Sequence, residues 1–548
     1  MQNDLRRIGA VVSINGAKVV AAFDPSLEHE AGSASKEADE GLPEFGGLVQ
    51  IRTRMSAVFG VISGQWVKDD VPANTQPVRM MSIDLLGEVM TDESDPECGS
   101  FRRGISLHPH IGAGVHNVTS KELAIIYAKP DAACARIGSV GREQKLPAYV
   151  VTDGLLGKHF AVLGTTGSGK SCSVALILRS ILDRHTNGHI LLLDPHNEYS
   201  AAFGDRAEVV NPTNLHLPYW LMNFDELAAA FVTQNGPDRQ TEISILKSAV
   251  WEARRNFVNN EDEAANVTVD SPVPFRLGEL EEIISNQMGR LNKAEGNLPY
   301  LRLVSRIESL RTDRRFEFMF SGLVVRDTMS DVLSRILRVP VDGKPVTIFD
   351  LSGVPSEIVD VVVSLLCRMT FDFAIWSAEA QAVPVLIVCE EAHRYVSHDG
   401  VTNFTLTRDA ISRIAKEGRK YGVSLCLVTQ RPSELSVTIL SQCNTIFALR
   451  MSNETDQNFV RKALPDGAGG LLAALPALHN REAIVVGEGV TVPMRFRFDE
   501  LEAAHRPKSS TAQFSTAWEY DVMDKSFIEE TVLRWRHQAR DEVCEYLD

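Results

Sequence analysis

The chain has 548 residues, of which 44% are hydrophobic and 23% are charged, and its formal net charge is −16. This length exceeds what one hydrophobic core usually supports, so we expect two or three domains. The acidic balance excludes a protein coated with basic surface, although a small basic channel inside an assembly remains compatible with it. The eight cysteines include no CxxC pair, which predicts free thiols in a reducing cytoplasm.

Neither the start of the chain nor its most apolar segment indicates a membrane protein. The start, MQNDLRRIGA, lacks the apolar stretch of a signal peptide. The most apolar segment, 358–376, is interrupted by Asp360, Arg368 and Asp372, and therefore indicates a buried helix instead of a membrane span. We expect a cytoplasmic protein without a membrane anchor.

The first region, residues 1–135, is rich in expected strands. A hairpin is predicted around Asn15-Gly16, because this dipeptide favours a tight turn between strands. Further strand-length runs follow at 48–53, 57–63, 78–89 and 122–128. Repeated short strands with glycine turns predict a small β-barrel. The polar, acidic segment 24–45 is interpreted as a flexible loop inserted in that barrel.

From about residue 150 the pattern changes to apolar strands that alternate with helical stretches. Such runs are typical of a mostly parallel sheet buried on both faces, and they occur at 159–164, 189–194, 346–351, 383–390, 423–430 and 445–450. Helix-like sequence at 223–335 interrupts the series as an insertion. We therefore divide the core into 136–222 and 336–495, and assign 496–548 to a C-terminal extension that ends in a helix.

A glycine-rich stretch between a predicted strand and a predicted helix fits the phosphate-binding pattern G-x-x-x-x-G-K-S. Its members are Gly164, Thr165, Thr166, Gly167, Ser168, Gly169, Lys170 and Ser171. In this pattern backbone N–H groups surround the β-phosphate of ATP, the lysine reaches the β- and γ-phosphates, and the serine hydroxyl binds Mg²⁺. We predict an ATP site with Mg²⁺.

A P-loop enzyme also needs a carboxylate at the end of a second strand. Glu390 and Glu391 follow the apolar run at 383–389. Glu390 is the candidate for the Mg²⁺ contact, either directly or through water, because its side chain is longer than that of aspartate. Glu391 is the candidate general base. Asp194, at another strand tip, has two open interpretations: support of the metal site, or a cap on the following turn. For His393 a structural role is favoured over zinc binding.

The run 423–430 is expected beside the P-loop strand, so Gln430 at its tip can sense the γ-phosphate or position the attacking water. The preceding turn EGRK places Arg419 at the opposite end of the same strand. From there it can reach the phosphates of a neighbouring subunit but not its own, which is the geometry of an arginine finger supplied in trans. Arg413 and Arg431 remain alternatives for this finger.

These motifs together resemble HerA, the hexameric DNA translocase of the HerA/FtsK group of P-loop NTPases. The resemblance covers most of the chain and rests on GTTGSGKS, DPHNEY, IFDLSGVP, EEAHRY, EGRKYGVSLCLVTQRPSEL and SQCNTIFALRMSNETD. It implies an α/β fold: a RecA-like P-loop core, a small N-terminal β-barrel, a helical insertion and a C-terminal brace. It also implies a homohexameric ring with a central channel for double-stranded DNA, and ATP hydrolysis by the residues named above.

Family members usually work with a nuclease, NurA, in DNA end processing, and bacterial relatives are paired with sirtuin-like or nuclease effectors in phage defence. The resemblance therefore implies such a partner, with the N-terminal barrel as its docking surface. Two positions depart from the pattern. Glu390 stands where many members of the wider group have aspartate, and Lys158 stands where an arginine in contact with phosphate is expected. Both departures predict slower hydrolysis.

Three alternatives to a DNA motor remain. The chain could be an ATP-regulated scaffold that presents a partner enzyme, a conjugation-type coupling ATPase, or a P-loop protein that is not a motor. For DNA contact, Arg311, Arg314 and Arg315 form one candidate cluster, although a solvated helical face is the favoured interpretation of this cluster.

Overall fold

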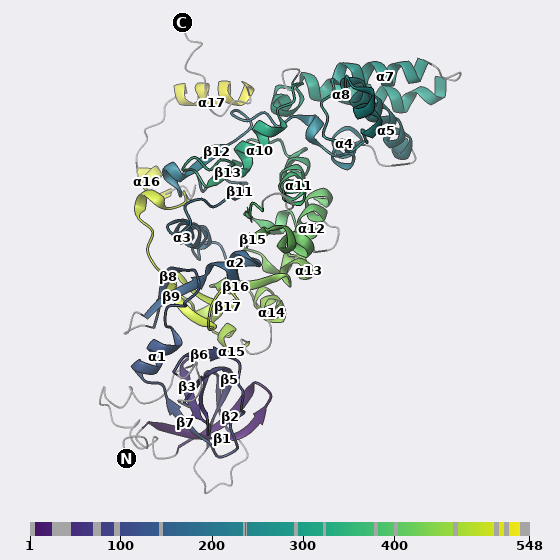
Figure 1. The fold of residues 1–548 in the computed structure, drawn as a ribbon. Helices are drawn as coiled ribbons and strands as arrows, with labels where there is room; N and C mark the ends of the chain where they lie inside the picture. The colour runs from purple at the N-terminus through teal and green to yellow at the C-terminus, as the bar shows by residue number, and fades with distance from the viewer. Residues whose placement is uncertain are drawn as a thin grey trace.

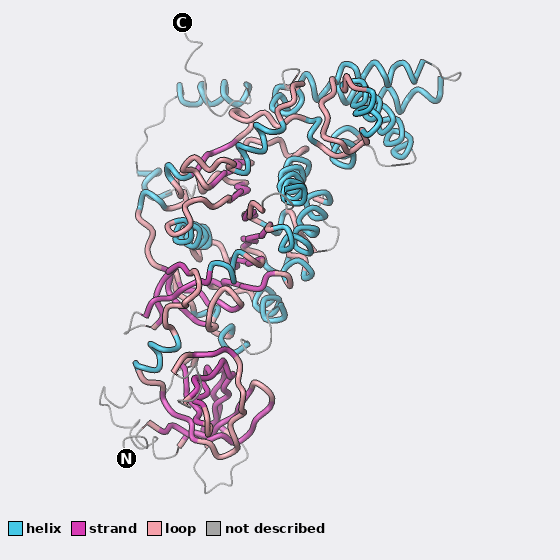
Figure 2. Tube along the Cα trace, in the orientation of Figure 1, coloured by secondary structure: helices cyan, strands magenta, loops and turns pink. Residues whose placement is uncertain are grey.

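The computed structural model describes residues 6–24, 45–68, 78–91, 99–141, 146–233, 236, 238–289, 294–321, 325–377, 382–398, 404–463, 469–508, 514–519 and 525–537. The molecule is elongated, with an all-β unit at the N-terminal end, a large sheet in the middle and a group of helices at the far end (Figure 1). Figure 2 shows that strands dominate the first unit and helices dominate the last. The predicted loop at 24–45 lies almost entirely outside the described residues.

The N-terminal unit is a closed barrel, as predicted. Its sheet runs β2-β1-β7-β3-β4-β5-β6, and an additional pairing of β2 with β5 closes six of these strands into a ring. The inward side chains, among them Val49, Ile51, Val58 and Ile83, are fully buried. The strands are β1 (Arg7–Asn15), β2 (Lys18–Phe23), β3 (Leu48–Arg52), β4 (Ser56–Val67), β5 (Arg79–Met90), β6 (Phe101–Arg103) and β7 (Gly114–Asn117).

One expected strand of this region is a helix instead. The run 122–128 forms most of α1 (Ser120–Ile126), so the strand prediction was wrong. Thr119 and Glu122 form a capping box, in which the Thr119 hydroxyl accepts from the Glu122 N–H and the Glu122 carboxylate accepts from the Thr119 N–H at 2.7 Å. This reciprocal cap satisfies two backbone donors of the first turn, and it outweighs the strand preference of the apolar run.

The central sheet has eleven strands in the order β12-β13-β11-β14-β15-β10-β16-β17-β18-β8-β9. The pairings from β12 to β16 are parallel, and those from β16 to β9 are antiparallel. The strands are β8 (Cys134–Val140), β9 (Leu146–Val151), β10 (His159–Leu163), β11 (Ile190–Asp194), β12 (Ala207–Val210), β13 (Val346–Asp350), β14 (Val385–Cys389), β15 (Val423–Thr429), β16 (Cys443–Leu449), β17 (Glu482–Gly487) and β18 (Met494–Phe498). All six apolar runs that were expected as core strands are therefore strands of one sheet.

Helices cover both faces of this sheet. One face packs against α3 (Lys170–Leu182), whose Val174 and Ile177 share a buried cluster with Phe160 and Val162 of β10. The other face packs against α11 (Val359–Ser377) and α12 (Thr405–Tyr421). Alternate residues of each strand thus enter different layers, as the two-residue period of a strand requires. In Figure 1, α3 lies on one side of β15, and α11 and α12 lie on the other.

The segment expected as a buried helix, 358–376, forms α11 and is buried along most of its length. Among the residues that the structure describes, none of the helices has the length and hydropathy needed to cross a bilayer.

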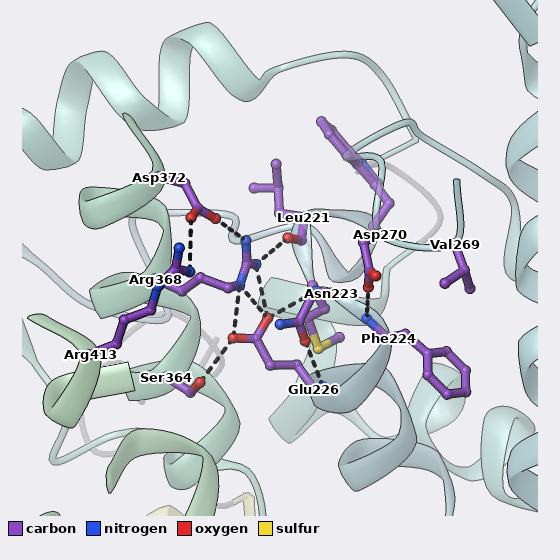
Figure 3. Close-up of polar contacts among 12 residues, drawn as sticks. Leu221, Asn223, Phe224, Glu226, Val269, Asp270, Ser364, Arg368, Asp372 and Arg413 are labelled. Carbon is purple, nitrogen blue, oxygen red and sulfur yellow. Dashed lines mark hydrogen bonds and ion pairs between the residues drawn. The ribbon is translucent and has the colours of Figure 1, made fainter. Parts of the chain in front are cut away.

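The helical insertion contains α4 (Phe224–Phe231), α5 (Asp238–Phe257), α6 (Glu261–Asn266), α7 (Leu277–Gly289), α8 (Leu298–Thr312), α9 (Glu317–Phe320) and α10 (Met329–Leu337). An ion pair buried at its base joins it to the core (Figure 3). Glu226 of α4 accepts from Ser364 at 2.9 Å and pairs with Arg368 of α11 at 2.9 Å. Arg368 also pairs with Asp372 at 3.0 Å. Because removal of one partner leaves a buried charge uncompensated, this pair fixes how α4 sits on α11.

Six further α-helices complete the described chain. They are α2 (Thr152–Leu156), α13 (Val437–Leu440), α14 (Glu454–Ala463), α15 (Gly469–Leu472), α16 (Phe514–Glu519) and α17 (Lys525–His537). The last one coincides with the helix expected near the C-terminus, and its described side chains are mostly exposed.

Candidate functional site

The predicted phosphate loop connects β10 to α3 at the carboxyl edge of the parallel strands. Gly167 and Gly169 adopt φ angles of 75° and 96°, a region that residues with a Cβ rarely enter, which explains glycine at both positions. The Lys170 ammonium donates to the carbonyl of Thr165 at 3.1 Å, so it lies across the loop. Burial lowers the pKa of Lys170, while Glu390 and Glu391 act in the opposite direction.

The two strands beside β10 hold this loop in place. The Gly164 N–H donates to Thr429 of β15 at 3.3 Å, and the Thr165 N–H donates to the Arg450 carbonyl, just after β16, at 3.0 Å. β10 and β15 are parallel neighbours, which confirms the predicted position of the 423–430 strand. Gln430 at its tip contacts the Thr166 hydroxyl.

The two acidic residues after β14 occupy different surroundings. Glu390 is buried, and the Tyr199 hydroxyl donates to it at 3.2 Å. Burial raises the pKa of Glu390 to about 8, and the neighbouring charge of Glu391 acts in the same direction. In the nucleotide-free protein Glu390 is therefore largely protonated at neutral pH.

Glu391 adopts the left-handed backbone conformation, with a φ of 51°. Its carboxylate accepts from the Gln430 amide at 2.8 Å, and lies 3.2 Å from Nδ1 of His393. Burial acts to raise the pKa of Glu391, but the hydrogen bond and charge of His393 and the charge of Lys170 outweigh it, so the pKa is lowered. Adjacent carboxylates with divergent pKa values suit separate roles in one site.

Glu198 also belongs to this site, although the sequence did not single it out as functional. The hydroxyl of Ser171 donates to its carboxylate at 2.8 Å. Its position in the sequence could have indicated this role. Glu198 lies four residues beyond Asp194, in the loop after β11, which is the first strand after the P-loop helix α3. Ser171, Glu198, Glu390 and Glu391 together offer hydroxyl and carboxylate oxygens, the donors that Mg²⁺ prefers.

In the part of the chain that the structure describes, no group of three or more His, Cys, Asp or Glu side chains is arranged to hold a metal ion by themselves. A Mg²⁺ that is bound through the serine hydroxyl, substrate phosphates and water requires no such group. The residues present therefore fit Mg²⁺ bound together with a nucleotide.

The structure shows the contacts of Asp194 and His393 near this edge. Asp194 accepts from the N–H groups of His196 at 3.1 Å and Tyr199 at 2.9 Å, so it caps the turn after β11. His393 lies 3.0 Å from the Thr429 hydroxyl and beside Glu391, which agrees with a structural role.

Arg419 lies at the opposite edge of the sheet. It occupies the last turn of α12, which ends at Gly422, where φ is 78° and the chain turns into β15. The seven residues of β15 separate it from Gln430 by about 20 Å along the strand. Its guanidinium is exposed, lines a cavity of about 550 Å³ with Lys416 and Lys420, and makes no ion pair with a described residue.

The two alternative finger residues are placed differently. Arg413 lies over the Phe371 ring and is 3.9 Å from Asp372. Arg431 lies at the carboxyl edge, next to its own P-loop, and pairs with Glu434 at 2.8 Å. The geometry therefore favours Arg419 over both as the residue that can serve a neighbour.

Lys158 corrects an expectation. It stands just before β10, at the end of that strand remote from the P-loop, and pairs with Glu488. The phosphate contact expected at this position is therefore wrong for the same subunit, because the whole of β10 lies between Lys158 and Gly164.

The arginines considered for DNA contact lie at the end of α8 and in the turn after it. Arg311 pairs with Glu281 at 3.1 Å, and Arg315 pairs with Asp313 at 2.6 Å. These acidic partners agree with the interpretation as a solvated face.

In this structure a P-loop follows a central parallel strand, and two carboxylates follow a nearby strand. This arrangement is that of a P-loop nucleoside triphosphatase. The family model of the central domain of helicase HerA matches residues 135–370. A DNA double-strand break repair helicase HerA from Sulfurisphaera tokodaii is 29% identical over 411 residues, which cover 72% of this chain and 74% of the relative. Its counterpart from Pyrococcus furiosus is 27% identical over 481 residues, 79% of each chain.

Among solved structures, VirB4 of Thermoanaerobacter pseudethanolicus aligns with a TM-score of 0.47 at 15% identity, over 68% of this chain and 98% of that chain. The conjugative coupling protein TrwB aligns with a TM-score of 0.43 at 14% identity, over 69% and 96%. The family match and the curated relatives together support a HerA-type ATPase.

Proposed function

We propose that this protein is an ATP-driven motor that moves double-stranded DNA through a homohexameric ring. The observation that carries the proposal is the separation of the two halves of the catalytic machinery. The phosphate loop and its carboxylates lie at one edge of the sheet, whereas Arg419, which makes no ion pair with a described residue, lies at the other. A site with a finger is completed only when the amino edge of one subunit faces the carboxyl edge of the next.

Each residue then has a defined task. Backbone N–H groups of 164–169 and the Lys170 ammonium hold the phosphates of ATP. Glu391, charged at neutral pH and held by Gln430, orients the attacking water and accepts its proton. Gln430, which also touches Thr166 in the loop, reports the presence of the γ-phosphate to β15. Ser171, Glu198 and Glu390 would hold Mg²⁺, and this ion would supply positive charge that neutralises the phosphates.

Arg419 of the adjacent subunit neutralises the charge that develops on the transferred phosphoryl group. Hydrolysis in one subunit thereby depends on its neighbour, which is what allows a ring to act on its substrate in sequence. The relatives whose names describe DNA double-strand break repair helicases support DNA as that substrate.

The proposal is tested by ATP hydrolysis with and without linear duplex DNA, together with native mass. We expect a hexamer whose turnover rises with DNA, and a Lys170→Ala variant that still assembles but loses turnover by about 10³-fold. Lys344→Ala, in an exposed turn, is the matched control and should behave as the wild type. A hexamer with turnover that ignores duplex DNA would contradict the motor.

A second candidate function is a scaffold for an effector enzyme, either a NurA-like nuclease or a sirtuin-like or nuclease defence protein. The observation that favours it is that the barrel exposes large apolar side chains: Trp66 and Val67 of β4 and the loop residues Leu107 and Ile111 are 45% to 68% exposed. Aromatic and apolar side chains are the ones that anchor partners at docking surfaces. Glu391→Gln separates the two functions, because a scaffold keeps activating its partner when hydrolysis is lost and a motor does not.

A further inference from the structure

A histidine begins the strand that leads into the phosphate loop. His159 is the first residue of β10, and it is 4% exposed. The other strands of the parallel part of the sheet all begin with hydrophobic residues, namely Ala207, Val346, Ile190, Val385, Val423 and Cys443. A buried imidazole costs free energy unless its nitrogens are hydrogen-bonded, so the contacts of His159 indicate its role.

Both ring nitrogens of His159 have partners. The N–H of Leu425 in β15 donates to Nδ1 at 3.0 Å. Nδ1 therefore carries no proton, and the neutral ring holds its proton on Nε2. Nε2 in turn donates to the carbonyl of Ala415 in α12 at 3.1 Å. Burial lowers the pKa of His159, so the ring stays neutral and keeps both bonds at neutral pH.

The bond to Ala415 holds the helical turn that presents Arg419. Ala415 lies four residues before Arg419, and α12 ends at Tyr421, so the bond and the arginine are about one turn apart. The same turn packs directly against the start of β15, because a Cβ added at Gly418 would lie 2.5 Å from the carbonyl oxygen of Val423. The position of Arg419 is therefore set from the buried side of α12, although its guanidinium is exposed.

β10 connects the two edges of the sheet. It has five residues and is followed by Gly164, where the phosphate loop begins. Its parallel neighbour β15 follows the turn that carries Arg419. At its start β10 holds α12 through His159, and at its end it leads into the phosphate loop. One strand thus contacts both the arginine turn that a subunit can offer to a neighbour and the P-loop that it uses itself.

We propose that His159 is a positioning residue that holds Arg419 in the orientation needed to reach the P-loop of the adjacent subunit. The inference rests on the proposed function, in which Arg419 acts in trans. His159 lies at the end of β10 remote from its own phosphate loop, so it acts through α12. Misplacement of a catalytic group by about 1 Å can cost about 10²-fold in rate. Loss of the bond therefore slows phosphoryl transfer in the neighbouring site and leaves ATP binding in place.

Two substitutions of similar size test the bond to α12. In His159→Gln the amide nitrogen reaches the place of Nε2 and can donate to Ala415, whereas the shorter side chain of His159→Asn reaches only the place of Nδ1. We expect His159→Asn to lower the kcat of ATP hydrolysis by about 10- to 100-fold, with little change in KM. His159→Gln should retain most of the wild-type kcat. Ser424→Ala is the matched control, because it removes a different hydrogen bond between these strands, from the Ser424 hydroxyl to the Lys158 carbonyl at 2.8 Å.

Mixed assemblies show which subunit carries the defect. His159→Asn keeps its P-loop but presents a misplaced arginine. Mixed with Lys170→Ala, whose arginine is intact, it should recover to about a quarter of the wild-type turnover when subunits mix at random. Mixed with Arg419→Ala it should not recover, because neither chain presents a working arginine. A histidine that only supported its own P-loop would give the reverse pattern, with recovery beside Arg419→Ala and none beside Lys170→Ala.

Native mass shows whether each variant assembles. His159→Leu, which is apolar like the residues that begin the neighbouring strands, is the second variant and should show the same pattern as His159→Asn. The inference is overturned if both variants keep the wild-type kcat, if the mixtures show the reverse pattern, or if His159→Gln loses as much activity as His159→Asn. The mixture of Lys170→Ala with Arg419→Ala is the reference. Its failure to recover would contradict the arginine finger in trans, whereas recovery there with the wrong pattern for His159→Asn contradicts this inference alone.

Discussion

The two edges of the central sheet differ in the charged side chains that they carry. The carboxyl edge gathers Glu198, Glu390 and Glu391 around Lys170, while the amino edge exposes Lys416 and Arg419 in one cavity. The same strand, β15, carries Gln430 at the first edge and follows the Arg419 turn at the second. In the proposed motor, each edge holds what the other needs for phosphoryl transfer, and the length of β15 keeps the two apart within a subunit.

The strongest test of this contrast places the defect of each edge on a different subunit. Arg419→Ala should lower turnover by about 10³-fold or more, because charge that develops in the transition state is no longer neutralised. Lys170→Ala should be similarly inactive. When the two inactive variants are mixed and reassembled, an intact P-loop can face an intact Arg419, and activity should return to about a quarter of the wild-type value if subunits mix at random.

If the finger acted within its own subunit, the mixture would stay inactive, and the comparison between the edges would lose its functional meaning. Lys420→Ala serves as the matched control for Arg419→Ala, because Lys420 lines the same cavity and should change turnover little. Native mass of every variant shows whether assembly itself is altered.

The next largest effect is expected within the carboxyl edge. Glu391→Gln should reduce turnover by about 10²- to 10³-fold, because the amide cannot accept a proton from water. ATP binding should remain within a few-fold of the wild type, as measured by calorimetry. Glu417→Gln, at the exposed amino edge, is the control. Normal turnover in Glu391→Gln, together with loss in Glu390→Gln, would assign the base to the buried neighbour instead.

The last prediction concerns the pH dependence of folding stability, which should distinguish Glu390 from Glu391. The pKa of Glu390 is raised to about 8 by burial, above the usual value for an exposed glutamate, so its ionisation favours the unfolded state. The nucleotide-free wild type therefore loses stability relative to Glu390→Gln as pH rises from about 4.5 to about 8. Above that range the difference should level off.

Thermal unfolding of both proteins from pH 5 to pH 9 measures this difference. The Tm advantage of Glu390→Gln should grow with pH over the lower part of the range. A constant difference in Tm would show that Glu390 titrates normally, and that its environment does not set it apart from Glu391.

Much of the fold was predictable because it depends on local pattern. The apolar runs specified buried parallel strands, and the glycine spacing specified the phosphate loop with its positive φ angles at Gly167 and Gly169. The strand expected at 122–128 failed because a capping box, formed by Thr119 and Glu122, overrode an apolar run of ambiguous type. The partners of Lys158 could not be read from the chain, because Glu488 is more than three hundred positions away.

The sequence by itself determined the chemistry at the P-loop: the residues of the loop, the paired glutamates and the arginine turn are local signals whose meaning follows from spacing. Tertiary structure alone decided which side chains meet. It placed Glu198 on Ser171, made Asp194 a turn cap and moved Lys158 away from the phosphates. The physical reason is that strand order and direction fix which loops share an edge, and those depend on packing between segments distant in the chain.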